Sequence, residues 1–285
     1  MTRIGVQAMM LKDSVAEIGA FETLRRVRDI GYRAVEVSQI PMIEANVAQL
    51  QRAKDEFDIE IAALSAGLKA GPGGNDSLEQ DLDKIVADSR RLGTQMVRIG
   101  MLPFEAMASL EAVLDFCDRT DAYARQLADS GIRLYYHNHH VEFAKFDGRL
   151  MLDIIADRAP NVGLELDVHW LQRGGVSPQA VIEQYAGRVR MVHLKDYRIG
   201  KMPDSAFESL AKGDVTGFMA AFSGVVQFAE VGEGNLDFSG IIPASIASGA
   251  EYLLVEQDDL YGRTVWEALQ TSHDNLVELG FADLF

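Results

Sequence analysis

SLEAVLDFCDRTDAYARQLADSGIRLYYHNH, residues 109–139, contains one helical segment followed directly by one β-rich run. The amphipathic part begins after Ser109, a residue suited to a helix N-cap, and ends at Gly131, a residue typical of helix C-termini. The run IRLYYHNH at 132–139 follows at once. A helix that stops at glycine and leads straight into a strand is the building unit of α/β proteins. We therefore expect this unit to recur along the chain.

The same unit does recur in the sequence. Two further amphipathic segments have serine as N-cap and glycine as stop: Ser14 to Gly31, and Ser77 to Gly93. Eight β-rich runs, each bounded by turn or polar residues, alternate with helical segments: RIGVQAMM (3–10), AVEVS (34–38), EIAALSAG (60–67), MVRIG (96–100), IRLYYHNH (132–139), GLELDVHW (163–170), VRMVHLKD (189–196) and EYLLVEQD (251–258). Eight strands alternating with helices over about 250 residues predict an α/β fold, a single (β/α)8 TIM barrel domain spanning residues 1–285.

The alternative fold is a doubly wound open sheet, which usually has a glycine-rich phosphate turn after its first strand. The first β-rich run here continues into MMLKDS, which contains no glycine, and this favours the barrel. One interval, residues 197–235 after the seventh strand, is too long for an ordinary connection. Long excursions in barrels commonly cover the active-site face, so we predict a lid-like insertion there.

Composition limits the classes of partner and compartment. The 285 residues carry a formal net charge of −16, which repels phosphate backbones and makes nucleic acid an unlikely partner. No run of about eighteen apolar residues occurs and no secretory signal pattern opens the chain, so no membrane contact is expected. The one cysteine, Cys117, forms no internal disulfide and suits a reducing compartment. We therefore expect a cytoplasmic protein.

Polar residues that can bind metals or transfer protons gather at the ends of four consecutive predicted strands. The residues at these ends are His137, Asn138, His139 and Glu142; Glu165, Asp167 and His169; His193, Lys195 and Asp196; Glu256 and Asp258. Active sites of barrels lie at the carboxyl ends of the strands, so these side chains should lie close together. Carboxylates gathered there would repel one another unless a divalent cation lay between them. Carboxylate oxygen combined with imidazole suits Mn²⁺, Mg²⁺, Co²⁺ or Zn²⁺.

Each of these residues also has a purely structural interpretation. Asp167 can cap a loop, His193 can be a hydrogen-bonded core histidine, and Glu256 can pair with a lysine. The arrival of all three in register on consecutive strands favours a metal site. Strand alternation should point His140 outward, and His273 lies in the last helical segment, where we expect a surface residue.

Several motifs, in this order, resemble those of a known family. YYHNHHVEF, GLELDVHW, MVHLKD, VGEGNLD and LLVEQD are similar to motifs of the xylose isomerase-like TIM barrels, the sugar phosphate isomerase/epimerase superfamily. The resemblance covers essentially the whole chain. It is to members similar to D-tagatose 3-epimerase, inosose dehydratase and hydroxypyruvate isomerase, which bind one divalent ion, often Mn²⁺.

The resemblance implies a ligand set of Glu, Asp, His and Glu from successive strands. Asp167, His193 and Glu256 match the last three ligands. The first ligand differs, because this chain has His137 at the strand tip where the epimerases have glutamate. We assign this ligand to Glu142, which the histidine-rich form of the motif retains, with His137 as the competing ligand.

The resemblance also implies an enzyme, a metal-dependent isomerase or epimerase that acts on a keto sugar or polyol through a metal-stabilised enediolate. Glu142 and Glu256 would transfer protons, while the other polar residues would bind substrate oxygens: His137, His139, His169 and Lys195. A metal-dependent dehydratase or lyase on a keto-polyol or keto-glycoside is the alternative. An endonuclease IV-like repair enzyme and a non-catalytic sugar-binding protein are the remaining alternatives. The sequence leaves open whether the chain forms a homo-oligomer.

Overall fold

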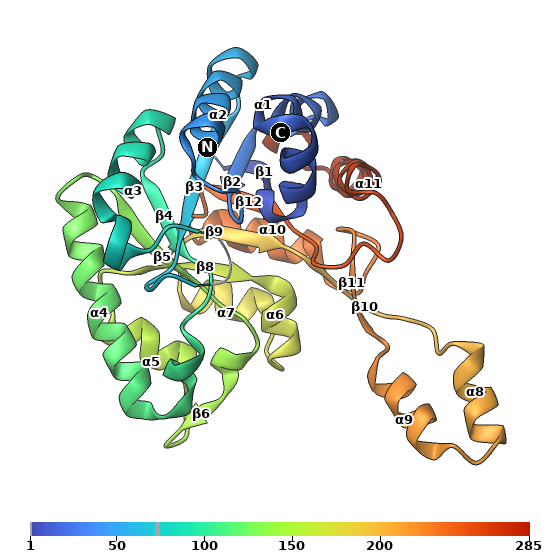
Figure 1. Ribbon diagram of the computed structural model, residues 1–285. Coiled ribbons are helices and arrows are strands. Elements are labelled where there is room, and N and C mark those ends of the chain that lie inside the picture. The colour runs from blue at the N-terminus through green and yellow to red at the C-terminus, as the bar shows by residue number, and fades with distance from the viewer. Residues whose placement is uncertain (1, 72–74) are drawn as a thin grey trace.

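The computed structural model describes residues 2–71 and 75–285 and contains a closed barrel of eight parallel strands (Figure 1). The barrel strands are β1 (Arg3–Gln7), β2 (Ala34–Val37), β3 (Glu60–Ala66), β4 (Met96–Ile99), β5 (Arg133–His137), β8 (Gly163–Asp167), β9 (Val189–Leu194) and β12 (Tyr252–Val255). Around the barrel they follow the order β1, β12, β9, β8, β5, β4, β3, β2. Pairing of β1 with β12 closes the barrel. The predicted (β/α)8 fold is confirmed.

Each predicted β-rich run contains one barrel strand, but several strands end earlier than predicted. The run at 163–170 shows why, because β8 ends at Asp167 and a helix begins at Val168. The Asp167 side chain accepts the backbone N–H groups of His169 and Trp170, which makes it the helix N-cap. The Asp167 carboxylate is therefore held in a fixed position, because its backbone belongs to β8 and its side chain is bound to the first turn of α6 (Val168–Arg173).

Helices surround the barrel and bury its outer face. They are α1 (Lys12–Ile30), α2 (Glu44–Phe57), α3 (Leu78–Leu92), α4 (Leu110–Ala128), α5 (Met151–Arg158), α6 (Val168–Arg173), α7 (Pro178–Gln184), α10 (Phe238–Ala247) and α11 (Val265–Glu278). Short elements complete this part of the chain: η1 (Ala8–Leu11), η2 (Phe104–Ala108), η3 (Val141–Phe143), η4 (Ala282–Leu284), β6 (Lys145–Phe146) and β7 (Arg149–Leu150). Among the described residues, no helix combines the length and apolar character needed to cross a membrane.

The predicted helix ends are correct in part. Ser77 and Ser109 are N-caps, accepting the backbone N–H groups of Gln80 and Ala112. The prediction of Ser14 as an N-cap is wrong, because η1 runs directly into α1 and places Ser14 inside the first turn. Glycines end α1 and α3 at Gly31 and Gly93, as predicted, whereas α4 already ends at Ala128, three residues before Gly131.

Residues 197–235 do not form the predicted cover over the barrel. They belong to β10 (Asp196–Ile199), α8 (Asp204–Ala211), α9 (Val215–Ser223) and β11 (Val226–Ala229), and β10 pairs with β11 in an antiparallel ribbon. Figure 1 shows this ribbon carrying α8 and α9 away from the barrel. We call residues 196–229 the arm. The lid-like position is not confirmed, because the ribbon pairs with itself and the two helices pack on each other through Phe207 and Phe218.

Asp196 fixes the base of the arm to the barrel. Its carboxylate accepts four backbone N–H groups, those of Tyr197, Gly232, Gly234 and Leu236, at 2.7–3.2 Å. Asp196 is fully buried, so these donors have little access to water as a substitute partner. One side chain thus holds together the outgoing strand of the arm and the returning segment before α10.

Replacing Asp196 with alanine should therefore destabilise the protein strongly. Buried donors left without an acceptor cost about 1–3 kcal/mol each, so we expect a fall in the melting temperature of at least about 5 °C. Asp214→Ala is the control, because this aspartate caps α9 on the arm and removal of an exposed cap costs about 1 kcal/mol. Equal thermal shifts for the two variants, measured by calorimetry, would contradict the assigned role of Asp196.

Candidate metal centre

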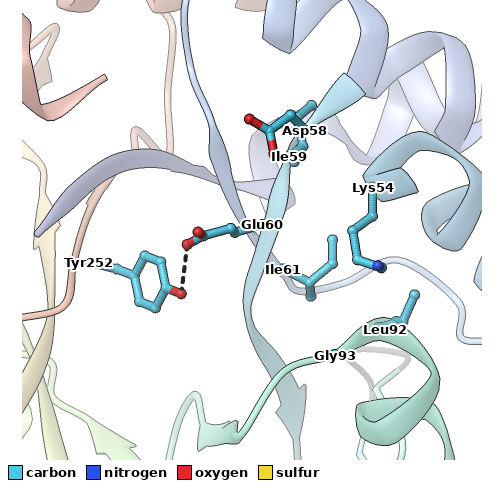
Figure 2. A pocket seen from close by; sticks show the side chains of 8 residues that line it. All are labelled: Lys54, Asp58, Ile59, Glu60, Ile61, Leu92, Gly93 and Tyr252. Atoms are coloured by element: carbon cyan, nitrogen blue, oxygen red, sulfur yellow. Dashed lines mark hydrogen bonds between the residues drawn. The ribbon is translucent and has the colours of Figure 1, made fainter. Parts of the chain in front are cut away.

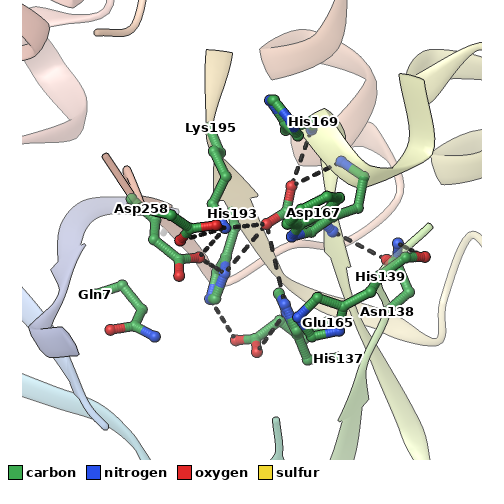
Figure 3. Close-up of polar contacts among 12 residues, drawn as sticks. Gln7, His137, Asn138, His139, Glu165, Asp167, His169, His193, Lys195 and Asp258 are labelled. Atoms are coloured by element: carbon green, nitrogen blue, oxygen red, sulfur yellow. Dashed lines mark hydrogen bonds and ion pairs between the residues drawn. The ribbon is translucent and has the colours of Figure 1, made fainter. Parts of the chain in front are cut away.

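The carboxyl ends of β5, β8, β9 and β12 bring four buried side chains together. They are His137, Asp167, His193 and Glu256, and their potential ligand atoms all lie within 4.8 Å of one another. We call these residues the four-donor group; Figure 3 shows most of it in its surroundings. The four strands are neighbours in the barrel, so the register of the sheet places their last residues side by side.

Each histidine of the group directs one ring nitrogen toward the other members of the group. Its second ring nitrogen lies near a carboxylate deeper in the barrel. His193 Nδ1 lies 2.5 Å from Glu256 Oε2, while its Nε2 lies 2.8 Å from Glu36 Oε2. His137 Nε2 lies 4.0 Å from Asp167 Oδ2, while its Nδ1 lies 3.3 Å from Glu165 Oε2. Histidines that bind metals commonly have this arrangement, in which a carboxylate on the second nitrogen orients the ring.

A second layer of buried charge lies deeper in the barrel. Arg98 Nε lies 2.5 Å from Glu36 Oε1 and 3.4 Å from Glu165 Oε2. Burial and the nearby Glu36 raise the pKa of Glu165 to about 7. Burial alone would also raise the pKa of Glu36, but Arg98 and His193 outweigh it and lower that pKa to about 2. The two carboxylates thus differ, because the charged form is favoured at Glu36 and disfavoured at Glu165.

Of this layer, Glu165 is one of the predicted strand-end residues, whereas Glu36 and Arg98 were not predicted to contribute to the site. Glu36 lies in the strand AVEV and Arg98 in the strand MVRI, each as the one charged residue of an apolar strand. A charged residue in an otherwise apolar barrel strand implies an oppositely charged partner across the barrel, because an unpaired buried charge is costly. The sequence contains the signal, but it does not identify the partner.

Lys195 lies beside the four-donor group and is fully buried. Its Nζ is 3.1 Å from Asp167 Oδ2, 3.2 Å from Glu256 Oε2 and 3.1 Å from Asp258 Oδ1. Burial would lower the pKa of Lys195. The three carboxylates, with Asp167 the strongest, outweigh burial and raise the pKa above its ordinary value, so the side chain stays an ammonium ion. Asp258, to which we had assigned no role, is thus the third carboxylate around this ammonium.

The donor atoms of the four-donor group suit a cation. Asp167 Oδ2, His193 Nδ1 and Glu256 Oε2 are buried and make no hydrogen bond of normal geometry with the described residues. Lys195 is within ion-pair distance of both oxygens without being aligned for a hydrogen bond to either. Burial raises the pKa of Asp167 to about 6, which reflects the cost of a carboxylate in this environment. A divalent cation would remove that cost, so the residues fit one.

The structure does not bring Glu142, our predicted first ligand, into the group. Glu142 lies in η3, is fully buried and uses both oxygens elsewhere. Its Oε1 accepts the Tyr136 hydroxyl at 2.5 Å, and its Oε2 accepts the His139 backbone N–H at 2.8 Å. His137 takes the fourth place because it is the last residue of β5, whereas the chain has already turned away from the barrel axis at Glu142.

The other predicted residues divide between the cavity and the base of the arm. His139 lines the cavity beside the group, and burial lowers its pKa to about 3, so its ring is neutral. His169 is not among the cavity residues; its Nδ1 lies 3.0 Å from the Asp196 carbonyl and its ring stacks on Phe228. His140 is exposed, as predicted.

A cavity of about 740 Å³ opens beside the four-donor group. It is lined on that side by His137, His139, Lys195, Glu256, Gln257 and Asp258, and on the other by the loops that follow β1 to β4. Another cavity, of about 420 Å³, lies at the amino ends of β3 and β12, where the Tyr252 hydroxyl donates to Glu60 (Figure 2). Its lining contains no histidine, and barrel chemistry is found at the opposite end. The larger cavity is therefore the candidate site.

Replacing Arg98 with methionine should destabilise the protein, because Glu36 and Glu165 would lose their shared cation. Breaking a buried ion pair costs about 3–5 kcal/mol in the free energy of unfolding. The double variant Arg98→Met/Glu36→Gln should recover part of this loss, since it removes one of the stranded charges. Urea unfolding in EDTA measures both values without any metal contribution. A double variant no more stable than Arg98→Met would contradict the pairing.

Comparison with known proteins places these features in a family. The sequence matches the family model of the xylose isomerase-like TIM barrel over residues 24–266. No curated protein sequence matches the chain.

Solved structures with the same fold share little sequence with the chain. A sugar phosphate isomerase/epimerase from Parabacteroides distasonis is 19% identical, with a TM-score of 0.73 over 99% of this chain and 100% of the other. An L-ribulose 3-epimerase is 18% identical, with a TM-score of 0.67 over 100% and 96% of the two chains. The probable 3-DHS dehydratase AsbF from Bacillus anthracis is 14% identical, with a TM-score of 0.68 over 97% and 99%. The family match over most of the chain, together with this shared fold, shows that the protein belongs to the xylose isomerase-like TIM barrel family.

Proposed function

We propose that the protein is a metal-dependent isomerase or epimerase of keto sugars or polyols, with its metal held by His137, Asp167, His193 and Glu256. The observation that carries this proposal is the four-donor group itself, in which donor atoms of four buried residues, three of them without hydrogen bonds, converge beside a large cavity. The isomerases and epimerases among proteins of similar fold support the reaction class.

Charge and donor type fit a divalent ion, and we propose Mn²⁺. A divalent cation balances the charges of Asp167 and Glu256, while Lys195 and Asp258 form a second balanced pair. With Glu142 as a ligand, the group would have had three carboxylates and a negative surplus. Two imidazole nitrogens beside two carboxylates also suit Co²⁺ and Zn²⁺, whereas Mg²⁺ prefers oxygen donors alone.

The reaction requires removal of a proton from a carbon next to a carbonyl group. When bound, the cation would act as a Lewis acid toward the carbonyl oxygen. Glu256 lines the cavity and is the base we propose. Burial would raise its pKa, but Lys195 and His193 outweigh burial and lower it, so the carboxylate is ionised, as a general base must be.

Lys195 and His139 are the residues we propose to bind substrate oxygens. Both line the cavity, one as an ammonium donor and the other as a neutral imidazole. Glu142 has no place in this cavity lining, so we propose that it positions His139 through the backbone N–H instead of transferring a proton. Return of the proton by Glu256 to the neighbouring carbon gives an isomer, whereas an epimer requires a second group that delivers a proton to the opposite face of the same carbon.

Dehydration is the second candidate reaction. Lys195 is an ammonium beside the proposed base, and such a group can assist departure of a hydroxyl from the adjacent carbon. The probable dehydratase among the proteins of similar fold supports this alternative. Both reactions begin with the same proton removal, so one experiment tests their common step.

Deuterium exchange tests that step directly. Purified protein with Mn²⁺ should exchange the proton next to the carbonyl of at least one sugar among D-fructose, D-tagatose, D-psicose, L-ribulose and D-xylulose in D₂O, followed by NMR. EDTA should abolish the exchange and added Mn²⁺ should restore it. Glu256→Gln should slow it by at least about 100-fold, the effect of losing a general base. Exchange that is unaffected by EDTA would contradict metal dependence.

Metal content distinguishes His137 from Glu142 as the ligand. His137→Gln should weaken Mn²⁺ binding more than about tenfold, as expected for changes at or next to a metal ligand, because it replaces a donor of the group. Glu142→Gln should keep its metal, since Glu142 contacts Tyr136 and His139 instead.

His140→Gln is the matched control, because it alters an exposed histidine in the same loop. Elemental analysis after dialysis against limiting Mn²⁺ gives the occupancy of each variant. Metal lost from Glu142→Gln but retained by His137→Gln would restore Glu142 as the ligand.

A further inference from the structure

The candidate cavity has two chemically different walls. In the barrel order, β12, β9, β8 and β5 form one contiguous half and carry the four-donor group. The loops after β1 to β4 form the other half of the rim. The loops after β1, β3 and β4 contribute the apolar side chains of Met9, Met10, Leu68, Met101 and Phe104, and the segment after β12 adds Leu260 to the cavity lining. We call these six residues the apolar wall.

The cavity is large for a single sugar ring. Its volume of about 740 Å³ falls in the upper half of the range of roughly 300–1,000 Å³ that holds drug-sized ligands. A monosaccharide bound at the four-donor group would therefore leave the apolar wall uncovered. Two of its side chains are already exposed, Phe104 at 71% and Met101 at 39%. Exposed apolar side chains that border a cavity indicate a ligand surface.

Several polar side chains that line this part of the cavity are engaged with the protein itself, whereas Lys12 and Asp13 are exposed at its rim. Gln7 Oε1 accepts the Met9 backbone N–H, and Asn75 Oδ1 accepts the Gln39 backbone N–H. Arg98 donates to Glu36 and Ser38.

At the rim, Lys69 pairs with Glu105 at 3.1 Å. Sugar hydroxyls buried against this wall would lose hydrogen bonds to water with few donors or acceptors to replace them. An apolar group there would gain from burial instead.

We infer that the substrate is a keto sugar or polyol joined to an apolar group about the size of a phenyl ring. The oxygen-rich end faces the four-donor group and the apolar end covers the apolar wall. This substrate class rests on the proposed function for the sugar end, whereas the apolar end depends only on the wall itself. It places the protein among enzymes that bind glycoside-like molecules more tightly than unsubstituted sugars.

Matched pairs of glycosides test the apolar end. Phenyl and methyl β-D-glucopyranoside, β-D-galactopyranoside and β-D-xylopyranoside are titrated calorimetrically into the Mn²⁺-loaded protein. At least one phenyl glycoside should bind tenfold or more tightly than its methyl partner. Tenfold equals about 1.4 kcal/mol, which burial of roughly 55 Å² supplies at about 25 cal/mol per Å². This is well below the area of an aromatic side chain, about 150–250 Å².

Variants assign the preference to the wall. Phe104→Ser and Met101→Ser should each lower the ratio of phenyl to methyl affinity at least threefold. Phe207→Ser is the control, since Phe207 lies on α8 of the arm with a similar exposure of 54% and should leave the ratio unchanged. Equal affinities within every pair, or a phenyl preference that neither wall variant reduces, would overturn the inference.

The experiments distinguish failure of the apolar subsite from failure of the proposed function. Deuterium exchange with unsubstituted keto sugars, together with equal affinities in all pairs, would sustain the metal chemistry and reject the apolar subsite. A phenyl preference that depends on Phe104, in a protein that neither retains Mn²⁺ nor exchanges deuterium, would sustain the subsite and reject the proposed function.

Discussion

The His193 imidazole is held at both ring nitrogens, and the rest of the site depends on this arrangement. Nε2 contacts the Glu36 and Glu165 carboxylates inside the barrel, and Nδ1 contacts Glu256 at the cavity. The deeper contacts fix the direction in which the outer nitrogen points, so the orientation of this donor does not require an ion. Arg98 compensates the deeper carboxylates, and Lys195 compensates the outer ones. The Arg98 guanidinium and the Lys195 ammonium thus compensate the carboxylates that are buried together inside the barrel.

The exchange of glutamate for histidine at the tip of β5 changes the electrostatics of the proposed centre. With His137 in the group, the protein contributes two negative charges, which one divalent ion balances. Negative charge that develops on a substrate oxygen then meets less repulsion than it would beside three carboxylates. Glu142 has a different physical task in the same loop, because its two hydrogen bonds join the Tyr136 side chain to the backbone at His139.

The order of strands divides the barrel rim into regions with different chemistry. The groups that we propose to bind an ion and substrate oxygens come from the contiguous strands β5, β8, β9 and β12, whereas the apolar wall, except for Leu260, follows β1, β3 and β4. The arm grows from the end of β9 and leads away from the barrel, so the mouth of the cavity is shaped by short loops. Phe228 at the base of the arm stacks on His169, which holds that ring at the edge of the site rather than in the cavity.

Local patterns in the sequence determined the eight strands, most of the helix ends and three members of the four-donor group. Asp167, His193 and Glu256 were predictable because strand alternation and the repeated unit place strand ends at one face of a barrel. His137 lies in the four-donor group and Glu142 outside it because β5 ends at His137 and Glu142 lies in η3, a boundary that the tertiary structure sets. The contacts of Arg98 with Glu36 and Glu165 and the direction of the arm were also beyond sequence reasoning. These features depend on which residues face one another across a closed barrel. The spacing of strands along the chain does not specify the distances between such residues.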